Sequence, residues 1–122
     1  MADVKINANK LLEIIPKKSV KTVVFCEVEK TAYEVFFYSL LEDGKWIQSN
    51  ELVDQEQISE DSLAEAINQL VDEIRLSEHY SPEMRNIISG NLSEKTTWDL
   101  EQVEKTIGLY KIKKEWKAKY IM

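Results

Sequence analysis

The spacing of apolar residues divides the first part of the chain into a helix followed by two strands. Apolar residues recur at roughly helical intervals between Val4 and Ile15, and Pro16 follows, so a short amphipathic helix is predicted there. The next run, VKTVVFCEVEK, is dense in β-branched and aromatic residues, which is typical of a strand. Residues 29–32 can form a hairpin loop, and a second strand is predicted over residues 33–41.

The stretch YEVFFYSLLEDGKWIQ, residues 33–48, predicts a hairpin with two apolar faces. Asp-Gly between two apolar runs is a strong hairpin signal, because both residues tolerate positive φ. A two-residue loop would pair Leu41 with Trp46 and Leu40 with Ile47. One face then carries Phe36, Tyr38, Leu40 and Ile47, and the other carries Val35, Phe37, Leu41 and Trp46. Either helices cover both faces, within a monomer or a dimer, or one aromatic face meets a partner.

A long helix follows an acidic connection over residues 48–58. Ser59 can cap this helix, and the two carboxylates of Glu60 and Asp61 favour its positive N-terminus. The helix is expected to end near Tyr80, and a shorter one should run from Pro82 to a stop at Gly90. The apolar stripe of the long helix consists of Leu63, Ala66, Ile67, Leu70, Val71 and Ile74.

The last thirty residues predict two further strands, with a helix as the open alternative. The segments 96–100 and 108–113 resemble strands, and in the second of them apolar residues alternate with lysines at a period of two that continues beyond it. A helix from Leu100 through Tyr110 competes, but it would hold Gly108 in its interior at a cost of about 1 kcal/mol. The lysine face is most simply a solvated strand face that discourages edge pairing.

The resulting element order is α-β-β-β-α-α-β-β. It predicts an α+β fold with a mainly antiparallel sheet of about five strands and with helices packed on the sheet. At 122 residues, 43% of them apolar and only 3 glycines and 2 prolines among them, the chain is expected to form one domain over residues 1–122.

Charge is unevenly distributed along the chain. Residues 31–80 contain 2 basic and 12 acidic side chains, whereas the whole chain has a net charge of −6. An acidic middle argues against direct nucleic-acid binding and favours a basic partner, although it also serves solubility.

Candidate catalytic and targeting features are sparse. Cys26 is the single cysteine and lies in an apolar run, so a buried, inert thiol is predicted, and His79 is the single histidine. Without a recognisable zinc site, catalytic triad or phosphate loop, we expect no enzymatic activity, no metal and no cofactor. No apolar run reaches the ~20 residues of a membrane span, and the first residues lack the unbroken apolar stretch of a signal peptide, so a cytoplasmic protein without membrane contact is predicted.

Several short motifs resemble the YezG-like family of bacterial immunity proteins, which are antitoxins of polymorphic and secreted nuclease toxins. Leu12-Glu13-Ile14-Ile15-Pro16 is similar to the helix-ending "IIP" of the family, and Phe25-Cys26-Glu27-Val28 continues the likeness. Val35-Phe36-Phe37-Tyr38 followed by Gly44-Lys45-Trp46-Ile47 resembles the "vyFyY" strand, turn and "gkyi" strand. Trp98 and Gly108-Leu109-Tyr110 can fill the places of the Trp-containing strand and the final Gly-aromatic strand, so the likeness spans residues 6–112.

The resemblance implies a protein that binds and neutralises a cognate toxin, with a basic nuclease domain as its partner. An acidic surface would compete with nucleic acid for the toxin, and aromatic side chains would anchor the contact. A homodimer is compatible with this role. The alternative is a chaperone like those of type III secretion, which holds an extended effector segment. The residues predicted to bind the partner are Tyr38, Trp46, Glu51, Asp54, Glu56, Glu60 and Asp61.

Overall fold

One antiparallel sheet with helices on both faces forms the fold, in a computed structural model that describes residues 2–92 and 97–121. The strands are β1 (Ala2–Lys5), β2 (Ser19–Val28), β3 (Tyr33–Leu41), β4 (Trp46–Gln48), β5 (Arg85–Asn91) and β6 (Thr97–Val103). Their order in the sheet is β1-β6-β5-β2-β3-β4, and every pair is antiparallel. The helices are α1 (Asn9–Ile14), α2 (Ser49–Asp54), α3 (Glu60–Leu76) and α4 (Leu109–Tyr120).

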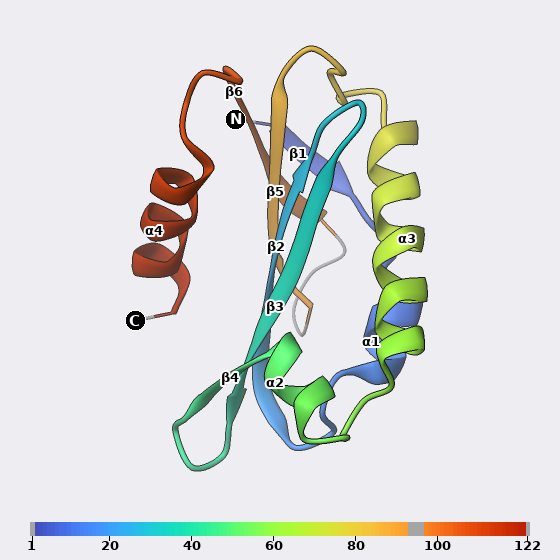
Figure 1. Ribbon diagram of the computed structural model, residues 1–122, viewed down its shortest axis with the longest axis vertical. Helices are drawn as coiled ribbons and strands as arrows, with labels where there is room; N and C mark the ends of the chain where they lie inside the picture. The colour runs from blue at the N-terminus through green and yellow to red at the C-terminus, as the bar shows by residue number, and fades with distance from the viewer. Residues whose placement is uncertain (1, 93–96, 122) are drawn as a thin grey trace.

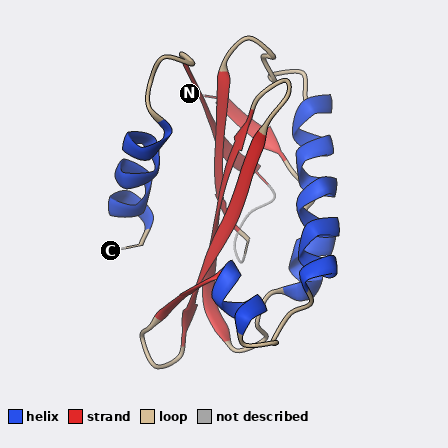
Figure 2. Ribbon diagram, in the orientation of Figure 1, coloured by secondary structure: helices blue, strands red, loops and turns tan. Residues whose placement is uncertain are grey.

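The predicted class, α+β with an antiparallel sheet, is confirmed. The predicted succession of element types, α-β-β-β-α-α-β-β, recurs from α1 to β6, with one more strand before it and one more helix after it. Its last four members lie on other segments than predicted, because residues 49–54, predicted as a connection, form the helix α2. Helices α1, α2 and α3 cover one face of the sheet, and α4 alone covers the other (Figures 1 and 2). The sheet is therefore the middle of three layers.

Two hydrophobic cores lie on the two faces of the central strand β2. Because successive strand residues point to opposite sides, Val24, Cys26 and Val28 enter the core under α3, whereas Val23 and Phe25 enter the core under α4. Both faces of the aromatic hairpin are thus covered within the chain. The sequence left open whether helices of the chain, a second subunit or a partner cover the second face, and in the structure α4 of the same chain covers it.

The register of the β3–β4 hairpin differs from the prediction by one residue. Leu40 lies opposite Trp46, and Ser39 opposite Ile47, because the turn has three residues rather than two. Gly44 ends this turn with φ of +86°, and its N–H donates to the Leu41 carbonyl at 3.0 Å. A shift of one residue exchanges the faces, so Trp46 faces α4 and Ile47 faces the α3 side.

The first helix is shorter than predicted. Residues 2–5 form the edge strand β1, and α1 begins only at Asn9. The backbone N–H groups of Asn7 and Ala8 donate to the carboxylate of Glu73 on α3, at 2.9 and 3.2 Å. Ala8 takes a left-handed conformation with φ of 49°, which separates the strand from the helix. A carboxylate 65 residues away in the sequence therefore sets this boundary.

The long helix α3 confirms its predicted start. The Ser59 hydroxyl accepts a hydrogen bond from the Ser62 N–H at 3.3 Å, as a capping residue should. Ala66, Leu70, Val71 and Ile74 of the predicted stripe are buried. The helix ends at Leu76, one turn before the predicted end near Tyr80.

The short helix predicted from Pro82 to Gly90 is wrong, because this segment forms β5, which pairs with β2 and β6. Ile87 faces the α4 side and Ile88 the α3 side, the pattern of a strand that is buried on both faces. Gly90 does not stop a helix: a side chain there would collide with Trp98 on β6, with only 2.5 Å between a Cβ and the indole ring.

Replacing Gly90 with alanine should lower the free energy of unfolding by about 2–3 kcal/mol, because Trp98 is fully buried and cannot yield without disturbing the core. Urea unfolding followed by tryptophan fluorescence measures this loss. Gly108→Ala is the control: nothing lies within 4 Å of its Cβ position, so only the preference of an N-cap for glycine over alanine is lost, and a change below about 1 kcal/mol is expected. Equal stability of the two variants would show that Trp98 can move.

The predicted strand over residues 108–113 is also wrong, whereas the strand predicted at 96–100 is confirmed as β6 from residue 97 on; Thr96 lies outside the described residues. Gly108 precedes α4 as its N-cap instead of lying in its interior. Leu109, Ile112 and Trp116 are spaced three and four apart, so one helical face meets the sheet and the lysines face outward.

Candidate functional site

Five exposed carboxylates follow one another along α2, the connection after it and the first turn of α3. None of the five has an ion-pair partner within residues 2–92 and 97–121. One of them also shapes the backbone, since Glu51 accepts a hydrogen bond from the Gln48 N–H at 3.2 Å and completes the cap of α2. These side chains, called the acidic segment below, are Glu51, Asp54, Glu56, Glu60 and Asp61.

An apolar hollow borders the acidic segment. It has a volume of about 830 Å³ and lies between the end of α1, the β3–β4 turn and the α2–α3 connection. Its lining includes the apolar residues Ile14, Leu41 and Ile58. The charged side chains that also line it are Glu13, Lys17, Lys18, Glu42 and Asp43, so it carries both signs of charge. Apolar walls next to the acidic segment suit a partner that presents basic and apolar groups together. This hollow was not predictable from the sequence, because its walls come from three separate segments.

Tyr38 and Trp46, the aromatic members of the predicted site, lie on the opposite face of the sheet from the acidic segment. Both are half-buried and pack against the core under α4. The Tyr38 ring is 6.2 Å from the ring of Trp116 on α4, and the Lys117 ammonium lies 5.4 Å from the Tyr38 centroid. The structure therefore brings the five carboxylates together but separates them from the two aromatic residues.

Comparison with known families supplies the context for these surfaces. The chain matches the model of one family, described as "Immunity protein YezG-like", over residues 4–97. The chain belongs to this family. The resemblance stated from the sequence is thus confirmed, and an immunity role favours binding over catalysis. Neither the curated proteins nor the solved structures include a significant match to the chain.

The YezG-like match ends at the first residue of β6, so α4 lies beyond it. The family match therefore says nothing about how this helix is attached to the sheet. Trp116 is its central contact: it packs edge-on against Phe25 and Phe36, with ring centroids 5.3 and 5.6 Å apart. Trp116 is 5% exposed, whereas Tyr110, one turn and a half earlier, is 79% exposed.

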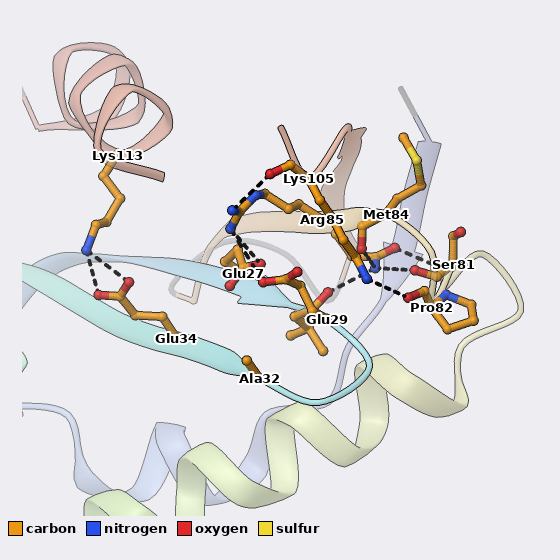
Figure 3. Close-up of polar contacts among 12 residues, drawn as sticks. Glu27, Glu29, Ala32, Glu34, Ser81, Pro82, Met84, Arg85, Lys105 and Lys113 are labelled. Carbon is orange, nitrogen blue, oxygen red and sulfur yellow. Dashed lines mark hydrogen bonds and ion pairs between the residues drawn. The ribbon is translucent and has the colours of Figure 1, made fainter. Parts of the chain in front are cut away.

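A cluster of charged side chains lies at the end of the sheet near the start of α4 (Figure 3). Arg85 on β5 lies close to two carboxylates, those of Glu27 on β2 and of Glu29 just after β2. Its Nη1 is 3.6 Å from Glu27 Oε1 and 3.4 Å from Glu29 Oε2. Its Nη2 donates to the Lys105 carbonyl at 3.2 Å in the connection to α4. Next to this cluster, Lys113 of α4 contacts both oxygens of Glu34, at 2.6 and 2.9 Å.

Glu27 is a buried carboxyl within this cluster. Only 2% of its surface is exposed, and its Oε1 has no hydrogen-bond partner among residues 2–92 and 97–121. Burial raises the pKa of Glu27 to about 7, and a hydrogen bond with Glu29 adds to this effect, while the Arg85 guanidinium opposes it. Arg85 is therefore the group that makes an ionised Glu27 tolerable in the folded chain.

The residues that the sequence offered for catalysis are not arranged around a common site. Cys26 is fully buried in the core under α3, and this burial raises the pKa of its thiol far above its ordinary value, which makes it unreactive. His79 is exposed, in the connection after α3. Among the described residues no three His, Cys, Asp or Glu side chains are grouped to hold a metal, and no helix is long and apolar enough to cross a membrane.

Proposed function

We propose that this protein neutralises a cognate bacterial toxin, a nuclease with a basic active cleft, by covering it with the acidic segment and the adjoining hollow. The single observation that carries the proposal is the group of five exposed carboxylates without ion-pair partners beside an apolar floor. Family membership supports an immunity role. The nuclease and the surface that meets it are assigned here from charge and shape.

Electrostatics explains why an immunity protein would carry such a surface. A nuclease must attract the phosphate backbone, so its cleft is positive, and a carboxylate-rich surface competes for the same field. Complementary charge also speeds encounter between two proteins, which matters when a toxin has to be stopped before it acts. The apolar floor, which includes Ile14 and Ile58, would slow dissociation once the charged groups have met.

Reversing the charge of the acidic segment should slow association with the cognate toxin domain. The variant replaces Glu51, Asp54, Glu56, Glu60 and Asp61 by lysine. We expect the association rate constant, measured by stopped-flow fluorescence, to fall about 10- to 100-fold at low salt and much less at high salt. Unchanged association at low salt would reduce the acidic segment to a solubilising surface.

A matched control separates position from net charge. Glu78, Glu83 and Glu104 are also exposed, and they lie in the α3–β5 and β6–α4 connections, at the other end of the molecule from α2 (Figure 1). The control reverses these three. The matching test variant reverses only Glu56, Glu60 and Asp61, so that the two triple variants change net charge equally, and it should still slow association clearly at low salt. The control should leave the association rate within about threefold of wild type, since distant charges are screened.

A further inference from the structure

Helix α4 has little intrinsic stability. Its N-cap is Gly108, which offers no side-chain hydrogen bond, and its first turn contains no acidic residue but does contain Lys111. A cation near a helix N-terminus opposes the macrodipole, and a helix of 12 residues is marginal on its own in water. The like charges of Lys113 and Lys117, four residues apart, weaken it further. The helix therefore depends on the sheet for its structure.

The contact of α4 with the sheet is narrow. Trp116 is the only buried residue of the helix, and its indole N–H has no hydrogen-bond partner in the described part of the chain. Two hollows flank this contact, of about 310 Å³ toward β5 and β6 and about 360 Å³ toward β3 and β4. Figure 1 shows α4 as a separate layer on this face of the sheet. Leu109, Ile112 and Tyr120 also pack against the core, but they are only partly buried, so Trp116 is the one deeply inserted anchor of the helix.

The sheet face beneath α4 combines an aromatic floor with an acidic edge. Phe25, Phe36 and Tyr38 form the floor around Trp116. Glu34 binds Lys113 on one side of the helix, and Asp99 accepts a hydrogen bond from the Tyr120 hydroxyl at 3.4 Å on the other. Asp99 and Glu101 also line the smaller hollow, together with Lys111 and Lys119. This face is complementary to an amphipathic helix that carries lysines and one central aromatic anchor.

We propose that the sheet face beneath α4 is a docking surface for a lysine-rich amphipathic helix of a protein partner, and that α4 occupies it in the free chain. The weak helix, its one buried side chain and the half-exposed pair Glu34–Lys113 together allow exchange. This surface lies across the sheet from the acidic segment, so the inference does not depend on the proposed function. Tyr38 and Trp46 lie under α4, so under this proposal they would contact the partner helix once α4 is displaced.

The test uses a synthetic, fluorescein-labelled peptide of residues 105–122 as the probe. Fluorescence anisotropy should show weak binding to the full-length wild-type chain, because the resident helix competes. Full-length Trp116→Ala should bind the same peptide at least about tenfold more tightly, by increasing the fraction of chains with an open face. A peptide with Trp116→Ala has the same charge and should not bind. Equal binding of the two peptides would assign the interaction to nonspecific charge and overturn the proposal.

A cross-linked variant keeps the test decisive if Trp116→Ala does not fold. The variant Glu34→Cys/Lys113→Cys carries a cysteine at each of two facing positions, and a bis-maleimide joins them. The control is the same variant with both cysteines capped by N-ethylmaleimide. Cys26 is fully buried and should not react. The joined form should lose peptide binding, and the capped form should keep it. Binding by the joined form, or by neither form, would contradict a displaceable α4. If the wild-type chain is a dimer and the peptide dissociates it, α4 of a second copy occupies the face, and the proposal that the chain's own α4 does so is overturned.

Discussion

Replacing Asn86 with alanine should lower the free energy of unfolding by about 3–5 kcal/mol, because one fully buried amide joins three parts of the fold. Its Nδ2 donates to the carbonyls of Val28 and Ser81, at 2.9 and 2.7 Å. Its Oδ1 accepts from the Ser81 N–H and from the side chain of Gln102, both at 3.0 Å. The amide thereby connects β5 to β2, to the connection after α3 and to β6.

Two comparisons separate the hydrogen bonds of Asn86 from its volume. Asn86→Asp keeps the shape but removes the donor, so it should also destabilise by at least about 2 kcal/mol at pH 7. Asn50→Ala removes an exposed amide of α2 and should change stability by less than about 0.5 kcal/mol. Urea unfolding followed by circular dichroism gives all three values. A loss below about 1 kcal/mol in Asn86→Ala would mean that water replaces the amide.

Elements whose signals are local were predictable from the sequence. The β2–β3 hairpin follows from two β-branched and aromatic runs with a short polar connection, and its loop closes through Glu29 and Ala32 as expected. Helix α3 follows from the Ser59 cap and a regular apolar stripe. The acidic segment was predictable because charge can be counted. In each case the decisive interactions join residues close in sequence.

Elements decided by distant contacts were not predictable. The run at residues 85–91 looks helical until it is seen between β2 and β6, where Gly90 makes room for Trp98. The alternation of lysines in α4 suggested a strand, although the spacing of Ile112, Trp116 and Tyr120 also fits a helix, and only the aromatic face of the sheet decides between them. The hollow beside the acidic segment and the Arg85 cluster likewise require the fold to bring separate segments together.

Replacing Arg85 with methionine should destabilise the protein by about 2–4 kcal/mol at pH 8, where Glu27 is ionised in the wild type, and by about 1 kcal/mol less at pH 5. Removal of one partner leaves a buried carboxylate without its counter-charge, which is more costly than removing both. The charged groups that act on Glu27 come from three places: Glu29 follows β2, Glu34 is on β3 and Arg85 is on β5. Among them Arg85 is the cation that lowers the pKa of Glu27.

The direction of the pH dependence follows from the raised pKa of Glu27. Between its ordinary value of 4.5 and the folded value of about 7, the folded chain holds a proton that the unfolded chain releases. The contribution of Glu27 to stability is therefore full below pH 4.5 and is lost as the pH rises through 7. Glu27→Gln keeps the shape without the charge and should remove this slope, which the difference between the two unfolding free energies measures at each pH.

The double variant Glu27→Gln/Arg85→Met isolates the interaction between the two residues. If the cost of losing Arg85 is the uncompensated Glu27 carboxylate, Arg85→Met should cost about 1 kcal/mol less at pH 8 in the Glu27→Gln background than in the wild type, because a carboxyl with a pKa of about 7 can take up a proton at this pH at little further cost. At pH 5 the two costs should converge, since Glu27 is already neutral there. Equal costs at both pH values would instead attribute the role of Arg85 to its bonds with Glu29 and the Lys105 carbonyl. Because the Lys105 bond fixes the connection that leads into α4, that result would make Arg85 a determinant of how firmly α4 is held.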